Sequence, residues 1–327
     1  MILIKHNNEG NLKPYFYFAL EEYVMEKLLK EDEAYFFTWE IKGVVIGKNQ
    51  VLENEVNLDY LKENNIDVYR RPTGGGAIYA DENNTMYTMI TKRTENFSFK
   101  PYLQLVIDAM KKLNLDIKFS GRNDLLFNDK KISGVAFLQN KYGFLIHGTY
   151  MYNVDIETMI RTITPNNEKL VSKGIESVRS RVENLKPFLN GMTQKELIKH
   201  LENEITTREY VLSDEEVTEI QERAKKFESK KWRFQVQPEH NKKLVKRIKG
   251  GLFEINLKIN KGIIDNIKIK GDFFDLFPVE TLEKAFINEE YTRDNMNGIF
   301  NKINIKNFFL DIDESEFKEL LLSGIIE

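Results

Sequence analysis

The sequence predicts an α+β protein with two folded units, a larger one built on a mixed β-sheet and a smaller one that follows it. In the first 150 residues, short β-branched and aromatic runs alternate with Gly and Asn, without the regular strand–helix alternation of a parallel α/β sheet. A charged stretch at residues 230–241, KKWRFQVQPEHN, then interrupts the hydrophobic pattern as a connection would. We therefore expect a first unit of residues 1–240, linker included, and a second of residues 241–327.

The composition is consistent with two units. The chain has 327 residues, of which 41% are hydrophobic, and this is enough for more than one core. Lys and Arg total 48 against 51 Asp and Glu, so charge predicts no general attraction to nucleic acid or to anionic membranes. No run has the length of a membrane span, and the first residues lack the apolar stretch of a secretory signal. We expect a cytoplasmic monomer that binds neither nucleic acid nor membrane.

The chain contains no cysteine, which excludes disulfides and any mechanism through a cysteine thioester. Its four histidines are scattered and show no metal-ligand spacing, so a zinc enzyme is disfavoured.

Hydrophobic periodicity predicts the elements of the first unit in order. Residues 14–29 have the pattern of an amphipathic helix that starts at a proline, and residues 35–46 that of a buried strand pair ending at Gly47. Further strands are predicted at residues 67–70, 77–79, 85–91, 124–127, 132–138 and 144–152, with a helix at 102–113. Two later helices are predicted at 193–205 and 213–227, the second with capping-box spacing between Ser213 and Glu216.

The second unit begins with a predicted hairpin. Residues 251–258 and 262–270 alternate on either side of an Asn–Lys–Gly turn, and helices are expected at 279–286 and 314–322.

The strongest chemical signal is the loop RRPTGGG between two predicted strands. It contains Arg70 and Arg71, followed by Gly74, Gly75 and Gly76. Glycines let backbone N–H groups approach an anion closely, and arginines add charge and forked donors. The loop lacks the Lys-Ser/Thr of a P-loop and the spaced glycines of a dinucleotide fold. Taken alone, a glycine triplet is more often a structural turn.

Two further segments carry polar residues at predicted strand ends. Asn123 and Asp124 precede one strand, and Lys131 stands at the start of the next, shortly before Gly134. Here a lysine can point into a site, although spacing does not distinguish Lys131 from its neighbour Lys130.

Two more segments are unremarkable when taken separately. His147, Gly148 and Thr149 would ordinarily form a packed strand end, and the basic stretch from Lys173 to Arg181 a solvated loop.

Taken in order, RRPTGGGAIY, GRNDL with KKISG, HGT, and KGIESVRSRV resemble the successive signatures of lipoate–protein ligases. These enzymes share a superfamily with biotin ligases and octanoyltransferases. The segments PYFYFALEEY, IGKNQ and GGLFEI extend the resemblance over nearly the whole chain. It implies a mixed-sheet biotin/lipoate ligase-like catalytic domain with a small α+β accessory domain.

The resemblance also implies residue roles. Arg71 and the backbone of Gly75 and Gly76 would contact the activated carboxyl and phosphate region, with Lys131 as the central catalytic cation. Supporting, nucleotide-side and covering contacts are expected from Arg70, Gly74, Ala77, Ile78, Tyr79, Asn123, Asp124, Gly134, His147, Gly148, Thr149, Lys173 and Arg181. The chain departs from the usual pattern at Tyr17, Ala80 and Asn83, where relatives commonly have Asn, His and Gly.

The implied reaction joins lipoate to a protein lysine at the expense of ATP, with Mg²⁺ neutralising the pyrophosphate. Expected partners are lipoate, with octanoate as an alternative acid, and the acceptor lipoyl domains of 2-oxoacid dehydrogenase E2 subunits and the glycine cleavage H protein. Strand segments 44–46 and 136–138 are apolar enough to line a slot for the acyl chain.

Three alternatives remain beside the ligase. A lipoyl or octanoyl transferase generally needs a cysteine nucleophile, which this chain lacks. A non-catalytic lipoate-binding paralogue is disfavoured by Lys131, Arg70 and Arg71. A biotin ligase would carry a Gly-Arg-rich loop in place of RRPTGGG.

Overall fold

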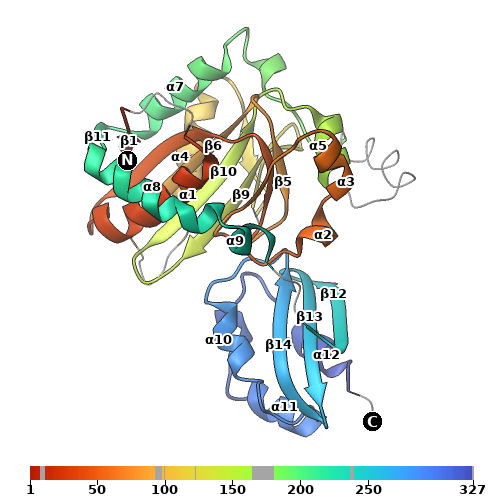
Figure 1. Ribbon diagram of the computed structural model, residues 1–327. Helices are drawn as coiled ribbons and strands as arrows, with labels where there is room; N and C mark the ends of the chain where they lie inside the picture. Colours follow the sequence, from red (N-terminus) through yellow and green to blue (C-terminus); the bar gives the residue numbers. More distant parts are fainter. Residues whose placement is uncertain are drawn as a thin grey trace.

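The structure is a computed structural model that describes residues 1–7, 12–92, 98, 100–121, 123–163, 180–235 and 239–325. Its first unit is built on an eight-stranded sheet with the strand order β11-β1-β2-β6-β10-β9-β8-β7 (Figure 1). Strand β1 runs parallel to both its neighbours, and the other strands pair antiparallel. The predicted mixed sheet is thereby confirmed. The strands are β1 (Ile2–Lys5), β2 (Ala34–Glu40), β6 (Asn84–Thr91), β7 (Ile117–Phe119), β8 (Asp124–Phe127), β9 (Lys130–Gln139), β10 (Phe144–Met151) and β11 (Arg208–Val211).

A second, three-stranded sheet lies beside the first and carries the glycine loop. It has the order β4-β3-β5, with β3 (Gly43–Ile46) parallel to β4 (Val68–Arg70) and antiparallel to β5 (Ile78–Ala80). The prediction that residues 35–46 form one strand pair was wrong, because β2 and β3 belong to different sheets. The side chains of Val44 and Ile46 pack against the short helices α2 (Leu52–Glu55) and α3 (Leu58–Glu63) and not against β2.

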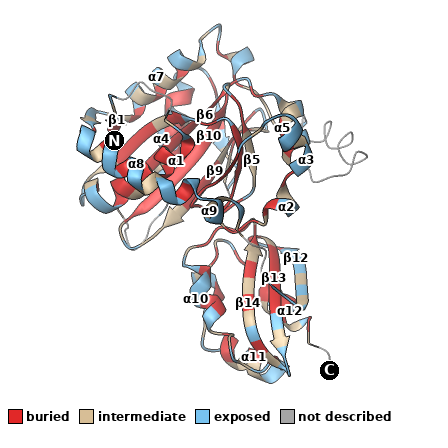
Figure 2. Ribbon diagram, in the orientation of Figure 1, coloured by how far each residue is buried: buried red, intermediate tan, exposed pale blue. Residues whose placement is uncertain are grey.

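Helices cover both faces of the large sheet, so its central strands are buried along their whole length (Figure 2). Helix α1 (Pro14–Tyr23), its π-helical extension (Val24–Leu28) and α8 (Asp214–Glu228) pack on the face that contains Phe37. Helices α4 (Lys100–Lys111) and α7 (Gln194–Ile205) pack on the opposite face with Phe36. Successive residues of β2 thus enter different cores, as the two-residue period of a strand requires. No helix in the described ranges is long and apolar enough to cross a membrane.

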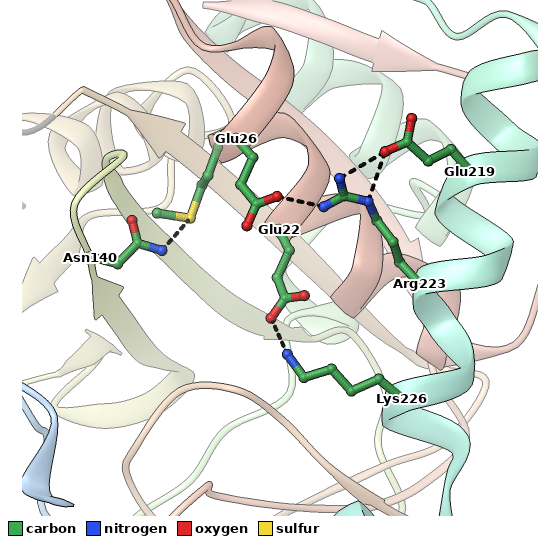
Figure 3. Close-up of polar contacts among 7 residues, drawn as sticks. Glu22, Glu26, Asn140, Glu219, Arg223 and Lys226 are labelled. Carbon is green, nitrogen blue, oxygen red and sulfur yellow. Dashed lines mark hydrogen bonds and ion pairs between the residues drawn. The ribbon is translucent and has the colours of Figure 1, made fainter.

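Helix α8 is held on α1 by an apolar contact with charged pairs along its edge. The rings of Phe18 and Phe227 meet edge to face with centroids 5.8 Å apart. Figure 3 shows Arg223 and Lys226 of α8 reaching Glu26 and Glu22, each at 2.7 Å. Because these pairs are partly exposed, each contributes about 1 kcal/mol or less, and the apolar contact contributes more.

The predicted cap of α8 is confirmed. The Ser213 hydroxyl accepts from the Glu216 N–H at 3.2 Å, and the Glu216 carboxylate accepts from the Ser213 N–H at 2.8 Å. Several short helices went unpredicted, among them α2, α3, α5 (Ile156–Ile163) and α9 (Lys230–Phe234), the last within the segment expected to be only a connection.

The second unit has its own sheet and core. Strands β12 (Lys242–Ile248), β13 (Gly251–Asn260) and β14 (Ile263–Gly271) form an antiparallel sheet, which packs against α10 (Val279–Lys284), α11 (Arg293–Phe300) and α12 (Glu314–Leu322). Phe253, Phe273, Phe309 and Phe317 form its centre. In Figure 1 this unit is the blue body below the larger one.

The two units touch through residues 271–277, which we call the bridging segment. The Gly271 N–H donates to the carbonyl of Asn49 at 3.0 Å, and the Asn49 amide donates to Asp275 at 2.9 Å. Lys48 lies 3.4 Å from the same carboxylate. The sequence offered only the charged linker as a connection, so this contact between the units was unexpected.

One partly buried acidic side chain at this contact, Glu55, has a shifted pKa. Burial raises the pKa of Glu55 to about 7, and the carboxylate of Asp272 adds to the shift while Arg247 opposes it. The group therefore holds its proton more tightly in the folded protein than in the unfolded chain.

We predict that the contact weakens as pH rises. A raised carboxyl pKa favours folding fully below about pH 4.5, and that contribution is lost between about pH 4.5 and 7. Relative to Glu55→Gln, the wild type should lose about 2 kcal/mol of unfolding free energy across this window. Urea unfolding of both proteins from pH 4.5 to 8 measures it. Parallel curves for the two proteins would contradict the prediction.

Candidate active site

A cavity of about 80 Å³ lies between the glycine loop and strands β9 and β10. It gathers side chains from three of the four predicted motifs and from the bridging segment. Its lining consists of Arg71, Gly76, Ala77, Ile78, Met86, Asn123, Lys131, Gly134, Val135, Ala136, His147, Gly148, Thr149 and Phe274. Of the segments expected to form an acyl slot, 136–138 contributes Ala136, whereas 44–46 is wholly in the core.

Lys131 faces this cavity from β9. Its ammonium lies 2.8 Å from the carboxylate of Asp124 on β8, and about a third of each side chain is exposed (35% and 30%). Lys130 points elsewhere, to Glu183 at 3.0 Å. The geometry thus separates the two lysines that spacing did not.

A β-bulge in β9 is responsible for this orientation. Leu125 of β8 pairs with Ser133, but Leu126 pairs with Lys131, so Ile132 is the extra residue. Residues that lie opposite each other on paired strands share a face, which puts Lys131 on the face of Gly134 and Asp124. Bulges commonly re-aim side chains next to active sites in this way.

Arg71 is buried and holds the glycine loop together. Its guanidinium donates to the carbonyls of Gly74 and Gly76, both at 2.7 Å, and to the hydroxyl of Thr73 at 3.0 Å. Burial lowers its pKa to about 9, and neighbouring Arg70 adds to the shift. Because the guanidinium binds carbonyls of its own loop, Arg71 shapes the cavity wall.

Arg70 is not brought to the cavity. It is fully buried and donates to the carbonyls of Gly47, Lys48 and Gln50 at 2.7–3.1 Å. Burial lowers its pKa to about 10. Arg70 therefore fixes the turn on which the bridging segment rests.

The remaining predicted residues have separate positions. Gly74 and Gly75 lie under the bridging segment, and Tyr79 lines surface grooves away from Lys131. The carbonyl of Arg181 accepts from the Lys131 N–H at 2.8 Å. Lys173 lies outside the described residues.

Gly75 is one of the points where the two units come into close contact. It has φ +87°, and its N–H donates to the carbonyl of Phe273 at 3.1 Å. A Cβ at this position would lie 2.6 Å from the ring of Phe274. The N–H expected to meet a ligand anion therefore has an acceptor from the second unit in this structure.

A buried carboxylate behind the cavity was not predicted. Glu21 of α1 lies 2.9 Å from Nδ1 of His147 and accepts from Thr88 at 2.8 Å. Nε2 of the same histidine lies 2.8 Å from the hydroxyl of Thr73. The signal was present in the sequence, because Glu21 falls three residues after Phe18 on the apolar stripe of its helix. This chain of contacts connects α1 to the glycine loop and orients His147.

Comparison with known proteins agrees with this geometry. A family profile described as the lipoyl protein ligase A/B catalytic domain matches residues 13–206, and one described as the bacterial lipoate protein ligase C-terminus matches residues 237–321. The chain is 32% identical to lipoate-protein ligase LplJ of Bacillus subtilis, over 98% of this chain and 100% of that protein.

Solved structures share the fold. The crystal structure of P. falciparum LipL1 in complex with lipoate superposes with a TM-score of 0.81 at 24% identity. The superposition covers 99% of this chain and 98% of the LipL1 chain. A bipartite lipoate protein ligase from Thermoplasma acidophilum, described with its E2 lipoyl domain, has a TM-score of 0.65 at 25% identity. This superposition covers 74% of this chain and 98% of the archaeal chain.

Fold and site together define an enzyme with a lipoyl ligase catalytic domain. Within that class, the chain belongs to the lipoate–protein ligase family. The resemblance inferred from the four motifs is thereby confirmed.

We predict that Gly75 and Gly76 differ sharply in their tolerance of a side chain. Gly75→Ala combines a left-handed φ with a clash against Phe274 and should cost about 1–3 kcal/mol of unfolding free energy. Gly76→Ala meets nothing within 4 Å and should cost about 0.5 kcal/mol or less. Denaturant unfolding of the two variants measures the difference, and equal costs would show that the units do not meet at Gly75.

Proposed function

We propose that this enzyme activates lipoate with ATP as lipoyl-AMP and then transfers the lipoyl group to a lysine of an acceptor protein, with Lys131 as the catalytic cation. The observation that carries the proposal is the position of Lys131. Its ammonium faces a cavity closed by the glycine loop, in a chain of the lipoate–protein ligase family.

The first half-reaction brings two anions together. A carboxylate oxygen of lipoate forms a bond to the α-phosphorus of ATP, and the bond between that phosphorus and the bridging oxygen breaks to release pyrophosphate. The ammonium of Lys131 offsets the repulsion between the carboxylate and the phosphate. Asp124, 2.8 Å away, holds that ammonium at the cavity wall until the substrates take its place.

The second half-reaction needs the same charge. The acceptor amine attacks the carbonyl carbon of the anhydride, AMP leaves with the former carboxylate oxygen, and the nitrogen loses a proton. Lys131 then stabilises the charge that develops on the carbonyl oxygen. A well-placed donor of this kind contributes about 3–4 kcal/mol to the transition state.

Mg²⁺ fits the donors beside Lys131. Asp124 and Asn123 offer the carboxylate and amide oxygens that this ion accepts. The described residues contain no group of three carboxylate, imidazole or thiolate side chains that could hold a metal ion. Mg²⁺ in nucleotide sites usually keeps several waters and binds through one or two carboxylates and the substrate phosphates. When bound, Mg²⁺ would neutralise charge on the departing pyrophosphate.

The proposed acceptors are lipoyl domains of 2-oxoacid dehydrogenase E2 subunits and the glycine cleavage H protein. Support comes from the archaeal ligase above, which is described together with its E2 lipoyl domain. Octanoate is an alternative acid, since an unbranched acyl chain makes the same demand for an apolar slot. The predicted covering loop, residues 173–181, lies almost wholly outside the described residues.

We expect Lys131→Ala to abolish both half-reactions while Lys130→Ala does not. The structure gives the two lysines different partners, and only Lys131 reaches the cavity. Pyrophosphate release with lipoate and ATP, and amide formation from synthetic lipoyl-AMP, should each fall about 10²–10³-fold in Lys131→Ala. Lys130→Ala should stay within a few-fold of wild type.

Circular dichroism and thermal unfolding provide the control, because a partly exposed lysine contributes little to stability. A folded Lys131→Ala protein that releases pyrophosphate at the wild-type rate would disprove the proposed role. In the wild type, pyrophosphate release that depends on lipoate but needs no acceptor distinguishes a ligase from a lipoate-binding protein.

A further inference from the structure

Phe274 is the one residue of the cavity lining, as far as the described residues show, that comes from the second unit. It lies in the bridging segment, more than 90 residues after the last of the four motifs. None of those motifs includes it.

The ring of Phe274 is packed as part of the catalytic unit. It is 3% exposed and belongs to the same hydrophobic cluster as Phe137 and Val135 of β9. It stacks on Phe137 with centroids 5.0 Å apart and an interplanar angle of 24°. Its edge also approaches Gly75 so closely that no side chain fits there.

The backbone on either side of the ring is fixed. The carbonyl of Phe273 accepts from the Gly75 N–H at 3.1 Å, and the carbonyl of Phe274 accepts from the Leu310 N–H at 3.0 Å. Asp275 is bound to Asn49 at 2.9 Å. A ring held by partners in both units has a defined position relative to Lys131.

The size of the cavity makes this position consequential. Ligand pockets ordinarily measure about 300–1,000 Å³, and the cavity here has a volume of about 80 Å³. Truncating a large buried side chain leaves a void on the order of 100 Å³. Removing this one ring would therefore change the cavity volume by an amount comparable with the cavity itself.

We propose that Phe274 is a specificity-determining residue of the acyl-activation site. It forms one wall of the cavity, limits the acids that fit, and excludes water from the mixed anhydride. The second unit thus takes part in adenylation directly, through a side chain. This proposal rests on the function proposed above, because it assigns the cavity around Lys131 to acyl activation.

The bridging segment offers a matched control. Phe277, three residues later, is 47% exposed and meets the ring of Phe308 at a centroid distance of 6.3 Å. Phe277→Ala removes the same side chain from the same segment without touching the cavity. Phe274→Leu keeps an apolar wall of smaller size.

The test compares wild type, Phe274→Ala, Phe274→Leu and Phe277→Ala as full-length proteins. Lipoate- and dodecanoate-dependent pyrophosphate release gives kcat and KM for a short and a long acid. AMP released per amide formed measures loss of the anhydride to water. Thermal unfolding identifies variants that fail to fold. If Phe274→Ala does not fold, the comparison rests on Phe274→Leu.

For Phe274→Ala we expect KM for lipoate to rise about tenfold and the preference for lipoate over dodecanoate to fall at least fivefold. AMP per amide should at least double. Phe274→Leu should show smaller changes in the same direction, and Phe277→Ala should match wild type.

Three results would overturn the proposal. In Phe274→Ala, an unchanged KM for lipoate would mean that the ring does not form a wall of the acid site. A lower KM would mean that the ring obstructs lipoate binding. The preference between the acids could stay unchanged. Phe277→Ala could reproduce the effects, which would mean that the whole segment has loosened. A wild-type protein without lipoate-dependent pyrophosphate release would instead refute the proposed function. Calorimetric measurement of lipoate binding to the same variants would then still test whether Phe274 forms a wall of the lipoate site.

Discussion

The site depends on two guanidinium groups that are held out of water by backbone carbonyls. Arg71 draws the carbonyls of Gly74 and Gly76 around itself, and Arg70 does the same with the turn at residues 47–50. Removing a cation from water is costly unless every donor finds a strong acceptor. Burial lowers the pKa of both guanidinium groups, and the hydrogen bonds to backbone carbonyls offset part of this cost. The glycine loop and the turn can therefore hardly rearrange independently of these side chains.

The two adjacent arginines, Arg70 and Arg71, have different structural roles. Adjacent arginines suggest a single basic patch for an anionic ligand, yet successive residues at a strand end point in opposite directions. Arg71 therefore shapes the cavity and Arg70 the surface on which the second unit rests. The bridging segment touches both structures, at Asn49 and at Gly75. The cavity and the contact between the units are consequently built on one framework.

The sequence predicted most elements of regular structure and the family, because hydrophobic periods and ordered motifs are local. It missed what depends on contacts between distant residues. Glu21 lies on the apolar stripe of its helix, but only the fold sets it against His147. Phe274 lies in none of the four motifs, and only the bridging segment brings it into the core of the first unit. Strands β2 and β3 looked like neighbours, because the change of sheet after Glu40 has no strong local signature.

The bulge at Ile132 decides which of the two neighbouring lysines, Lys130 or Lys131, faces the cavity. Along a regular strand, residues separated by an even number share a face, so Gly134 would share its face with Lys130. The extra residue breaks this parity and gives the position to Lys131 instead. One residue added to β8 between Leu125 and Leu126 would restore regular pairing, turn Lys131 away and bring Lys130 into its place. The ammonium group that reaches this cavity is thus specified by strand register as much as by residue type.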